Sequence, residues 1–356
     1  MRLKFDHMKN SLAFILPVII GLSSCGGGQQ DQPVADAGPS QADKDLLQQA
    51  QTYFQALPAT AENSENKITD EKVKLGKTLY FDTRLSLKGN NSCNSCHNLD
   101  TYGVDNLPTS KGDAGNFGER NSPTVYNAAL HAIQFWDGRA KDVEEQAGGP
   151  ILNPVEMAIP NEAFIEKKLR GVEEYQPMFK AAFPDDKEAI TFANITKSIA
   201  AFERTLLTPS KFDDFLKSDN NALTAEEKDG LKTFMDAGCI TCHNGPAVGG
   251  TMMQKFALFG DYRELTHSKG NDEGLKKQTK KESDKDMFKV PSLRNIEKTG
   301  PYFHDGSVAD LKEAIKIMGK TELNKDLSQA DIDKIYVFLK ALTGKLPNNA
   351  KQTAMN

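Results

Sequence analysis

The sequence predicts an all-α protein of two similar domains, because a cysteine motif and a helical pattern each occur twice. Its 356 residues exceed the usual length of one domain, which favours two. Cys93-Asn-Ser-Cys96-His97 and Cys239-Ile-Thr-Cys242-His243 have the same spacing. We expect a first domain at 46–212, a second at 213–345 and a loose tail at 346–356.

A helix is predicted before each motif, and another helix closes each half. The earlier helices are expected at residues 71–81 and 225–235, each with a glycine followed four positions later by an aromatic residue. Thr69 is a candidate N-cap of the first helix, and Thr224 with Glu227 predicts a capping box at the second. Apolar residues at helical spacing predict the closing helices: Ile195, Ile199, Phe202 and Leu206, then Ile332, Ile335, Tyr336, Leu339 and Leu342.

The N-terminus has the pattern of an export signal. A cationic start precedes the apolar run 11–22, which is too short for the roughly 20 residues of a membrane-spanning helix. Leu22-Ser23-Ser24-Cys25 resembles a bacterial lipobox, in which the cysteine becomes the acylated first residue. We expect a lipoprotein signal at 1–24, a polar tether at 25–45 and a periplasmic, membrane-anchored protein of a Gram-negative bacterium. An ordinary signal with Cys25 as a stray thiol is the alternative.

The other four cysteines all belong to the two repeated motifs. C-x-x-C-H is the attachment signature of c-type haem: Cys93 and Cys96, or Cys239 and Cys242, reach the two vinyl groups of one porphyrin. His97 or His243 then ligates the iron from below. A redox dithiol or half a zinc site is the alternative, but the histidine after each pair disfavours both. The net charge of −5 argues against nucleic-acid binding.

Longer stretches resemble the bacterial di-haem cytochrome c peroxidases, which are related to the di-haem maturases of tryptophan-derived cofactors. The resemblance covers nearly all of the mature chain and is carried by these segments: Arg120–Thr124, Phe135–Arg139, Glu145–Gln146, Gly149–Met157, Val290–Asn295, Gly300–Gly306 and Ile317–Gly319. It implies two cytochrome c-like domains, each with one covalent haem c and with its first and last helices crossing at the glycine. It also implies an enzyme that reduces hydrogen peroxide to water with electrons from a small periplasmic cytochrome c or cupredoxin.

The same resemblance implies roles for individual residues. Met318 becomes the distal ligand of the second haem, closing it for electron transport, and Trp136 lies between the haems. Glu156 and Gln146 become the active-site pair above the first haem, where a buried carboxylate can take and return a proton. For Met318 and Trp136 the alternative is a packing role in the core, and for Glu156 it is a solvated surface position.

A calcium ion and a homodimer are further implications of the resemblance. The matching calcium ligands are the Asn121 side-chain oxygen and the main-chain carbonyls of Thr299 and Pro301, completed by water. Ligation by oxygen alone suits Ca²⁺. A capped turn is the alternative reading of Asn121.

One position departs from the family pattern. Many of these peroxidases close the first haem with a histidine on a mobile loop, and here Asp113 stands at that position. We expect an open first haem that needs no reductive activation, with weak capping by Asp113, Glu119 or another loop as the alternative. His131 is a further candidate ligand, but we expect it to be packed in the interior. The Gly112–Gly118 stretch is expected to let its loop move. We expect the charged segment 276–289 to be a solvated loop.

Two other functions fit the motifs. A plain di-haem electron carrier would have two closed haems and no peroxide turnover. A di-haem oxidase of a specific protein or small-molecule substrate would turn over peroxide slowly.

Overall fold

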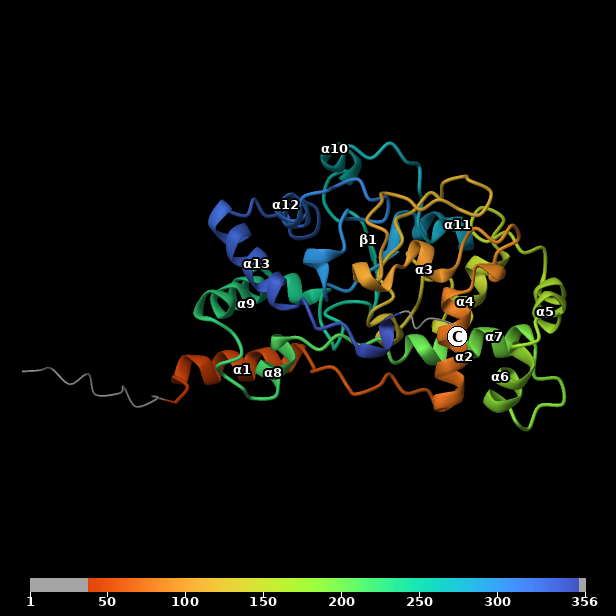
Figure 1. The fold of residues 1–356 in the computed structure, drawn as a ribbon. Coiled ribbons are helices and arrows are strands. Elements are labelled where there is room, and N and C mark those ends of the chain that lie inside the picture. Colours follow the sequence, from red (N-terminus) through yellow and green to blue (C-terminus); the bar gives the residue numbers. More distant parts are fainter. Residues whose placement is uncertain (1–37, 352–356) are drawn as a thin grey trace, which may run out of the picture. The chain divides into compact units, whose positions relative to one another are not determined.

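Two pairs of crossing helices organise residues 38–351, the part of the chain that the computed structural model describes. Helix α2 (Asp70–Phe81) packs against α7 (Phe192–Glu203), and α9 (Ala225–Ala237) packs against α13 (Gln329–Ala341) (Figure 1). A Cβ atom at Gly76 would lie 1.8 Å from the Ser198 carbonyl oxygen, and one at Gly230 would lie 2.2 Å from that of Lys334. Only glycine permits these crossings, so the predicted helix pairing is confirmed.

The predicted caps are also confirmed. The Thr69 hydroxyl accepts a hydrogen bond from the backbone N–H of Lys72. Thr224 and Glu227 form the reciprocal capping box at α9. Helix α7 ends at Glu203, so Leu206 lies beyond the helix predicted to contain it, although it is fully buried.

Each helix pair has its own hydrophobic cluster. Leu75, Tyr80 and Phe202 belong to the cluster of the first half, and Phe212 and Phe338 belong to that of the second. These apolar faces explain why both pairs form, since burial of such side chains is the main stabilising contribution.

The two terminal segments pack away from their own halves. Helix α1 (Gln41–Tyr53) lies beside α8 (Lys211–Leu216) in the second cluster, where the Phe54 and Phe212 rings meet edge to face at 5.3 Å. The 3₁₀ turn Asn348–Ala350 brings the buried Ala350 into the first cluster. Helix α1 therefore begins within the segment expected to be a tether, and the expected tail contributes to the core.

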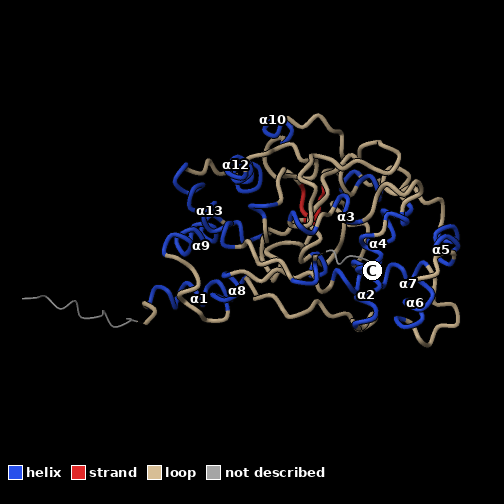
Figure 2. The backbone as a smooth tube through the Cα atoms, in the orientation of Figure 1, coloured by secondary structure: helices blue, strands red, loops and turns tan. Residues whose placement is uncertain are grey.

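The remaining elements surround the middle of each half. They are α3 (Cys93–Cys96), α4 (Val143–Leu152), α5 (Glu162–Arg170), α6 (Tyr175–Ala182), α10 (Tyr262–Thr266), α11 (Lys276–Thr279) and α12 (Leu311–Leu323). A small antiparallel sheet pairs β1 (Met253–Lys255) with β2 (Met287–Lys289), with Gln254 opposite Phe288 (Figure 2). The fold is thus mostly helical, and this sheet is its departure from the all-α prediction. Within residues 38–351, none of the helices has the length and apolar character needed to span a bilayer.

The expectation of a solvated loop at 276–289 is wrong at its C-terminal end. Strand β2 brings Phe288 and Lys289 into the interior, where they are 5% and 4% exposed. The backbone N–H of Lys289 donates to the Trp136 carbonyl at 2.7 Å, which joins the strand to the first half of the chain. Cys25 and the expected signal lie outside the described residues.

Candidate functional site

The first motif opens onto a narrow cavity of about 190 Å³ between α3, α4 and α7. Cys93, Cys96 and His97 line it. The His97 Nδ1–H donates to the Pro123 carbonyl at 2.9 Å, which leaves Nε2 as the metal-binding nitrogen. Burial lowers the pKa of His97, so its imidazole is neutral and suited to ligation.

The second motif opens onto a wider cavity of about 580 Å³, within the range of cofactor pockets. Cys239, Cys242 and His243 line one part of it, and Met318 from α12 lines it as well. Burial lowers the pKa of His243 to about 4, which keeps this imidazole neutral. The fold thus brings Met318 into the cavity of His243, as the resemblance implied.

The cysteines fit covalent haem attachment better than the alternatives. The four form no disulfide with one another, and burial raises the pKa of Cys96 to about 11 and that of Cys239 to about 12. Redox-active dithiols need lowered thiol pKa values, so a thioredoxin-like role is disfavoured. Residues 38–351 contain no cluster of three or more His, Cys, Asp and Glu side chains arranged to bind a metal ion.

Glu156 and Gln146 line the same cavity as His97. Gln146 lies on α4, and Glu156 follows the end of that helix. Burial raises the pKa of Glu156, although the Arg139 charge and the Asn153 amide act in the opposite direction. Asn153 Nδ2 donates to Glu156 Oε1 at 2.8 Å, which fixes one carboxylate oxygen and leaves Oε2 available.

Arg139 is a member of this cavity that the sequence did not single out. Its guanidinium lies 3.4 Å from the Phe135 ring centre and pairs with the buried Asp137 at 2.9 Å. The sequence contained a clue to this residue, because Arg139 is the last residue of the Phe135–Arg139 segment that resembles the family. Glu203 on α7 was also missed; it is fully buried in this cavity, and burial raises its pKa to about 8.

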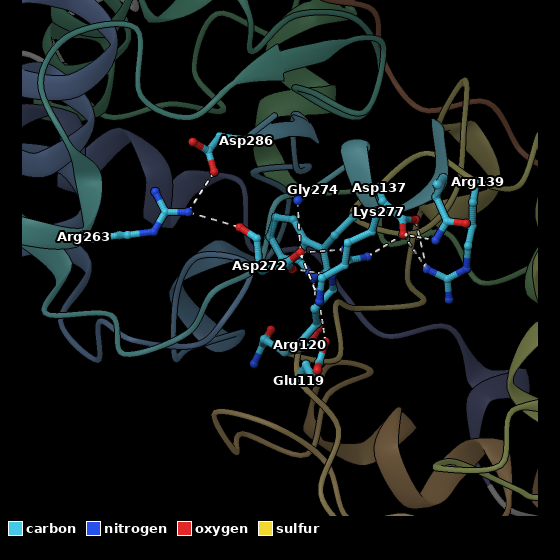
Figure 3. Close-up of polar contacts among 12 residues, drawn as sticks. Glu119, Arg120, Asp137, Arg139, Arg263, Asp272, Gly274, Lys277 and Asp286 are labelled. Carbon is cyan, nitrogen blue, oxygen red and sulfur yellow. Dashed lines mark hydrogen bonds and ion pairs between the residues drawn. The ribbon is translucent and has the colours of Figure 1, made fainter. Parts of the chain in front are cut away.

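Asp137 also belongs to a network of ion pairs that extends away from Arg139 (Figure 3). Arg120 pairs with Asp137 at 2.7 Å and with Asp272 at 2.6 Å, so it joins the two halves of the chain. Burial opposes ionisation of Asp272, but the contacts with Arg120 lower its pKa to about 2. Arg263 donates to the Asp272 carbonyl and to Asp286, which ties the segment before β2 into the same network.

Trp136 lines both cavities. Its Nε1–H donates to the Asn121 carbonyl at 2.9 Å, and its ring meets that of His304 edge to face with centroids 6.4 Å apart. The hydrogen bond and this contact hold the indole between the two sites.

Asn121, Thr299 and Pro301 line the second cavity together. Asn121 Nδ2 donates to the Leu107 carbonyl at 2.9 Å, so the side-chain oxygen is the atom available to a cation. Thr299 and Pro301 reach the cavity from the segment after the 3₁₀ turn Ile296–Lys298.

The Asp113 side chain is held by hydrogen bonds and is 3% exposed. Its carboxylate accepts from the Ser86 hydroxyl at 2.8 Å and from the backbone N–H groups of Lys88 at 2.6 Å and Asn90 at 2.9 Å. Burial by itself raises a carboxyl pKa, yet these bonds outweigh it and the pKa of Asp113 lies below its ordinary value. This bonding leaves the carboxylate poorly suited to metal ligation.

The loop around Asp113 is itself bonded. Lys111 and Phe117 form an antiparallel bridge, and the Asp113 N–H donates to the Glu156 carbonyl at 2.7 Å. Glu119, the other weak-capping candidate, is exposed and paired with Lys277 at 2.6 Å.

Comparison with known proteins agrees with this geometry. Residues 70–221 match the model of the di-haem cytochrome c peroxidase family. The chain is 47% identical over 292 residues to the cytochrome c551 peroxidase of Nitrosomonas europaea, covering 82% of this chain and 84% of the relative. It is 45% identical over 312 residues to the cytochrome c551 peroxidase of Pseudomonas aeruginosa, covering 86% and 89%.

The chain belongs to the di-haem cytochrome c peroxidase family. Among solved structures, a MauG-like protein associated with microbial copper homeostasis superposes with a TM-score of 0.71 at 29% identity. That match covers 81% of this chain and 94% of the solved chain. Membership of this family identifies haem c as the cofactor that the two cysteine motifs bind.

Proposed function

We propose that this protein is a cytochrome c peroxidase that reduces hydrogen peroxide to two molecules of water, using electrons from a small periplasmic cytochrome c or cupredoxin. The observation that carries the proposal is the shared cavity of His97, Glu156 and Gln146. The relatives named as cytochrome c551 peroxidases, at 45–47% identity, support it further. When bound, haem c supplies an iron centre that accepts the peroxide oxygen and exchanges electrons.

The residues of the first cavity transfer the proton of hydrogen peroxide and hold the peroxide in place. Glu156 Oε2 takes a proton from hydrogen peroxide and returns it to the departing oxygen, which leaves as water. Asn153 orients the carboxylate through Oε1. Gln146 holds the peroxide through its amide, and the nearby Arg139 charge limits how far the pKa of Glu156 rises.

Asp113 keeps the first site open. The bonds that Ser86, Lys88 and Asn90 donate hold its carboxylate outside the lining of the cavity that contains His97. The enzyme is then active without prior reduction. A low-spin signal from a six-coordinate first haem in the fully oxidised protein would contradict this part of the proposal.

The second cavity collects electrons. His243 and Met318 would hold the second haem, which would supply an electron-accepting iron there, and Trp136 lies where electrons would pass between the two cavities. Asn121 Oδ1 and the carbonyls of Thr299 and Pro301 bind a calcium ion there. Attachment to the membrane through an acylated Cys25, the division into two haem domains and a homodimer complete the proposal.

Steady-state oxidation of reduced cytochrome c by hydrogen peroxide tests the function. Glu156→Gln should lower kcat by roughly 10²–10⁴-fold, the usual contribution of a general acid–base group. Glu162→Gln is the control, because Glu162 is exposed in the first turn of α5 and lies outside both cavities. Absence of turnover in the wild-type protein would indicate an electron carrier. Slow turnover with any cytochrome donor would indicate an oxidase of another substrate.

A further inference from the structure

Lys289 is a buried cation whose charge has no partner in the described part of the chain. Its side chain is 4% exposed at the end of β2, and it lines both the first and the second cavity. No carboxylate of residues 38–351 forms an ion pair with it. Its ammonium group contacts the His131 imidazole, with 3.4 Å between Nζ and Nδ1. Charged groups this deeply buried are normally paired, because removal from water is costly.

The contact with Lys289 determines the tautomer of His131. An ammonium group only donates hydrogen bonds, so Nδ1 must be the acceptor and Nε2 must carry the proton. This Nε2–H is shielded from solvent and has no partner among the described residues. The site therefore offers a positive charge and a second, unused donor.

The neighbouring backbone holds both groups in position. The Lys289 N–H donates to the Trp136 carbonyl at 2.7 Å, and the Ala132 N–H donates to the Gly250 carbonyl at 2.9 Å. Gly250 has a φ of +78°, and a Cβ atom there would lie 2.3 Å from the His131 ring. The glycine thus allows the backbone at residue 250 to pack in direct contact with the His131 imidazole.

We propose that Lys289 and His131 bind a carboxylate, and that its source is a propionate group of a haem held in one of the two cavities. A propionate supplies the missing negative charge and an acceptor for His131 Nε2–H. It also lies at the edge of the porphyrin, where a cation favours the reduced iron. The inference rests on the two haems of the proposed function and adds a residue pair to their binding.

Burial alone lowers the pKa of Lys289 to about 8, which leaves the amine mostly protonated at neutral pH. His131 is neutral, because burial and then the Lys289 charge lower its pKa well below the ordinary value.

The test compares midpoint potentials of both haems in the holoenzyme, measured by spectroelectrochemical titration. Lys289→Met should lower the potential of the haem whose propionate it binds, and should make that potential depend more steeply on pH near neutrality. Lys289→Arg should retain a near-wild-type potential. Lys285→Met is the matched control and should leave both potentials unchanged, since Lys285 lies just before β2, is exposed and lines neither cavity.

Unchanged potentials for both haems in Lys289→Met, with full haem content, would overturn the proposal and leave Lys289 solvated by cavity water. If Lys289→Met fails to assemble, Lys289→Arg decides through resonance Raman spectroscopy. The propionate bending mode should shift, because the donor geometry changes, and an unshifted mode would also overturn the proposal. The wild-type peroxide assay remains a separate test of function, so the two failures are distinguishable.

Discussion

Arg294→Met should be among the most destabilising single substitutions in the protein. Arg294 forms a bidentate pair with Asp213 in α8, with both N–O distances at 2.8 Å and both side chains fully buried. Its Nε–H also donates to the Pro246 carbonyl, three residues after His243. Removing one partner of such a pair leaves a buried charge, which costs about 3–5 kcal/mol. The methionine side chain fills much of the volume of the Arg294 side chain. The loss in stability therefore comes mostly from the unpaired Asp213 charge rather than from a cavity.

Urea unfolding of the holoenzyme, followed by circular dichroism, measures the loss as a lower midpoint at an unchanged slope. Lys334→Met is the control, because Lys334 pairs with Asp229 at 3.0 Å while 45% and 51% of the two side chains remain exposed. Such an exposed pair contributes less than about 1 kcal/mol. If Arg294→Met also lowered the free energy of unfolding by less than about 1 kcal/mol, the argument that burial strengthens the effect of losing one partner would be refuted.

Four further predictions follow from the same geometry. Gly76→Ala should cost roughly 1–3 kcal/mol or more in thermal unfolding, since its Cβ would meet the Ser198 carbonyl. Asp113→Ala should destabilise the protein at neutral pH. Because the folded pKa of Asp113 is lowered, the difference should persist above the unfolded value of about 3.9 and shrink as pH falls through the folded value. Asn121→Ala should weaken calcium binding in calorimetric titrations of chelator-treated protein; equal affinity would exclude Asn121 as a ligand. The pH–rate profile should show an acidic limb above pH 4.5, the ordinary pKa of a glutamate, because burial raises the pKa of Glu156; Glu156→Gln should remove that limb.

Much of the fold is encoded in short-range patterns. Helix α9 begins at the capping box of Thr224 and Glu227, and α2 begins at Thr69, because a cap bonds to residues two or three positions away. The glycines at the crossings also follow from the sequence, since they stand at matching positions in the two halves. The small sheet was not predictable, because strands of three residues carry no periodic signal.

The site divides in the same way. By itself the sequence predicted the two haem attachment points and the histidine beside each, because both depend only on the spacing of residues along the chain. Only the tertiary structure decided that the Asp113 carboxylate faces Ser86, and that Lys289, in a segment expected to be solvated, is buried beside His131. Burial and pairing of a charge depend on residues more than 100 positions away in the chain, here His131 and Lys289, and no local pattern records them.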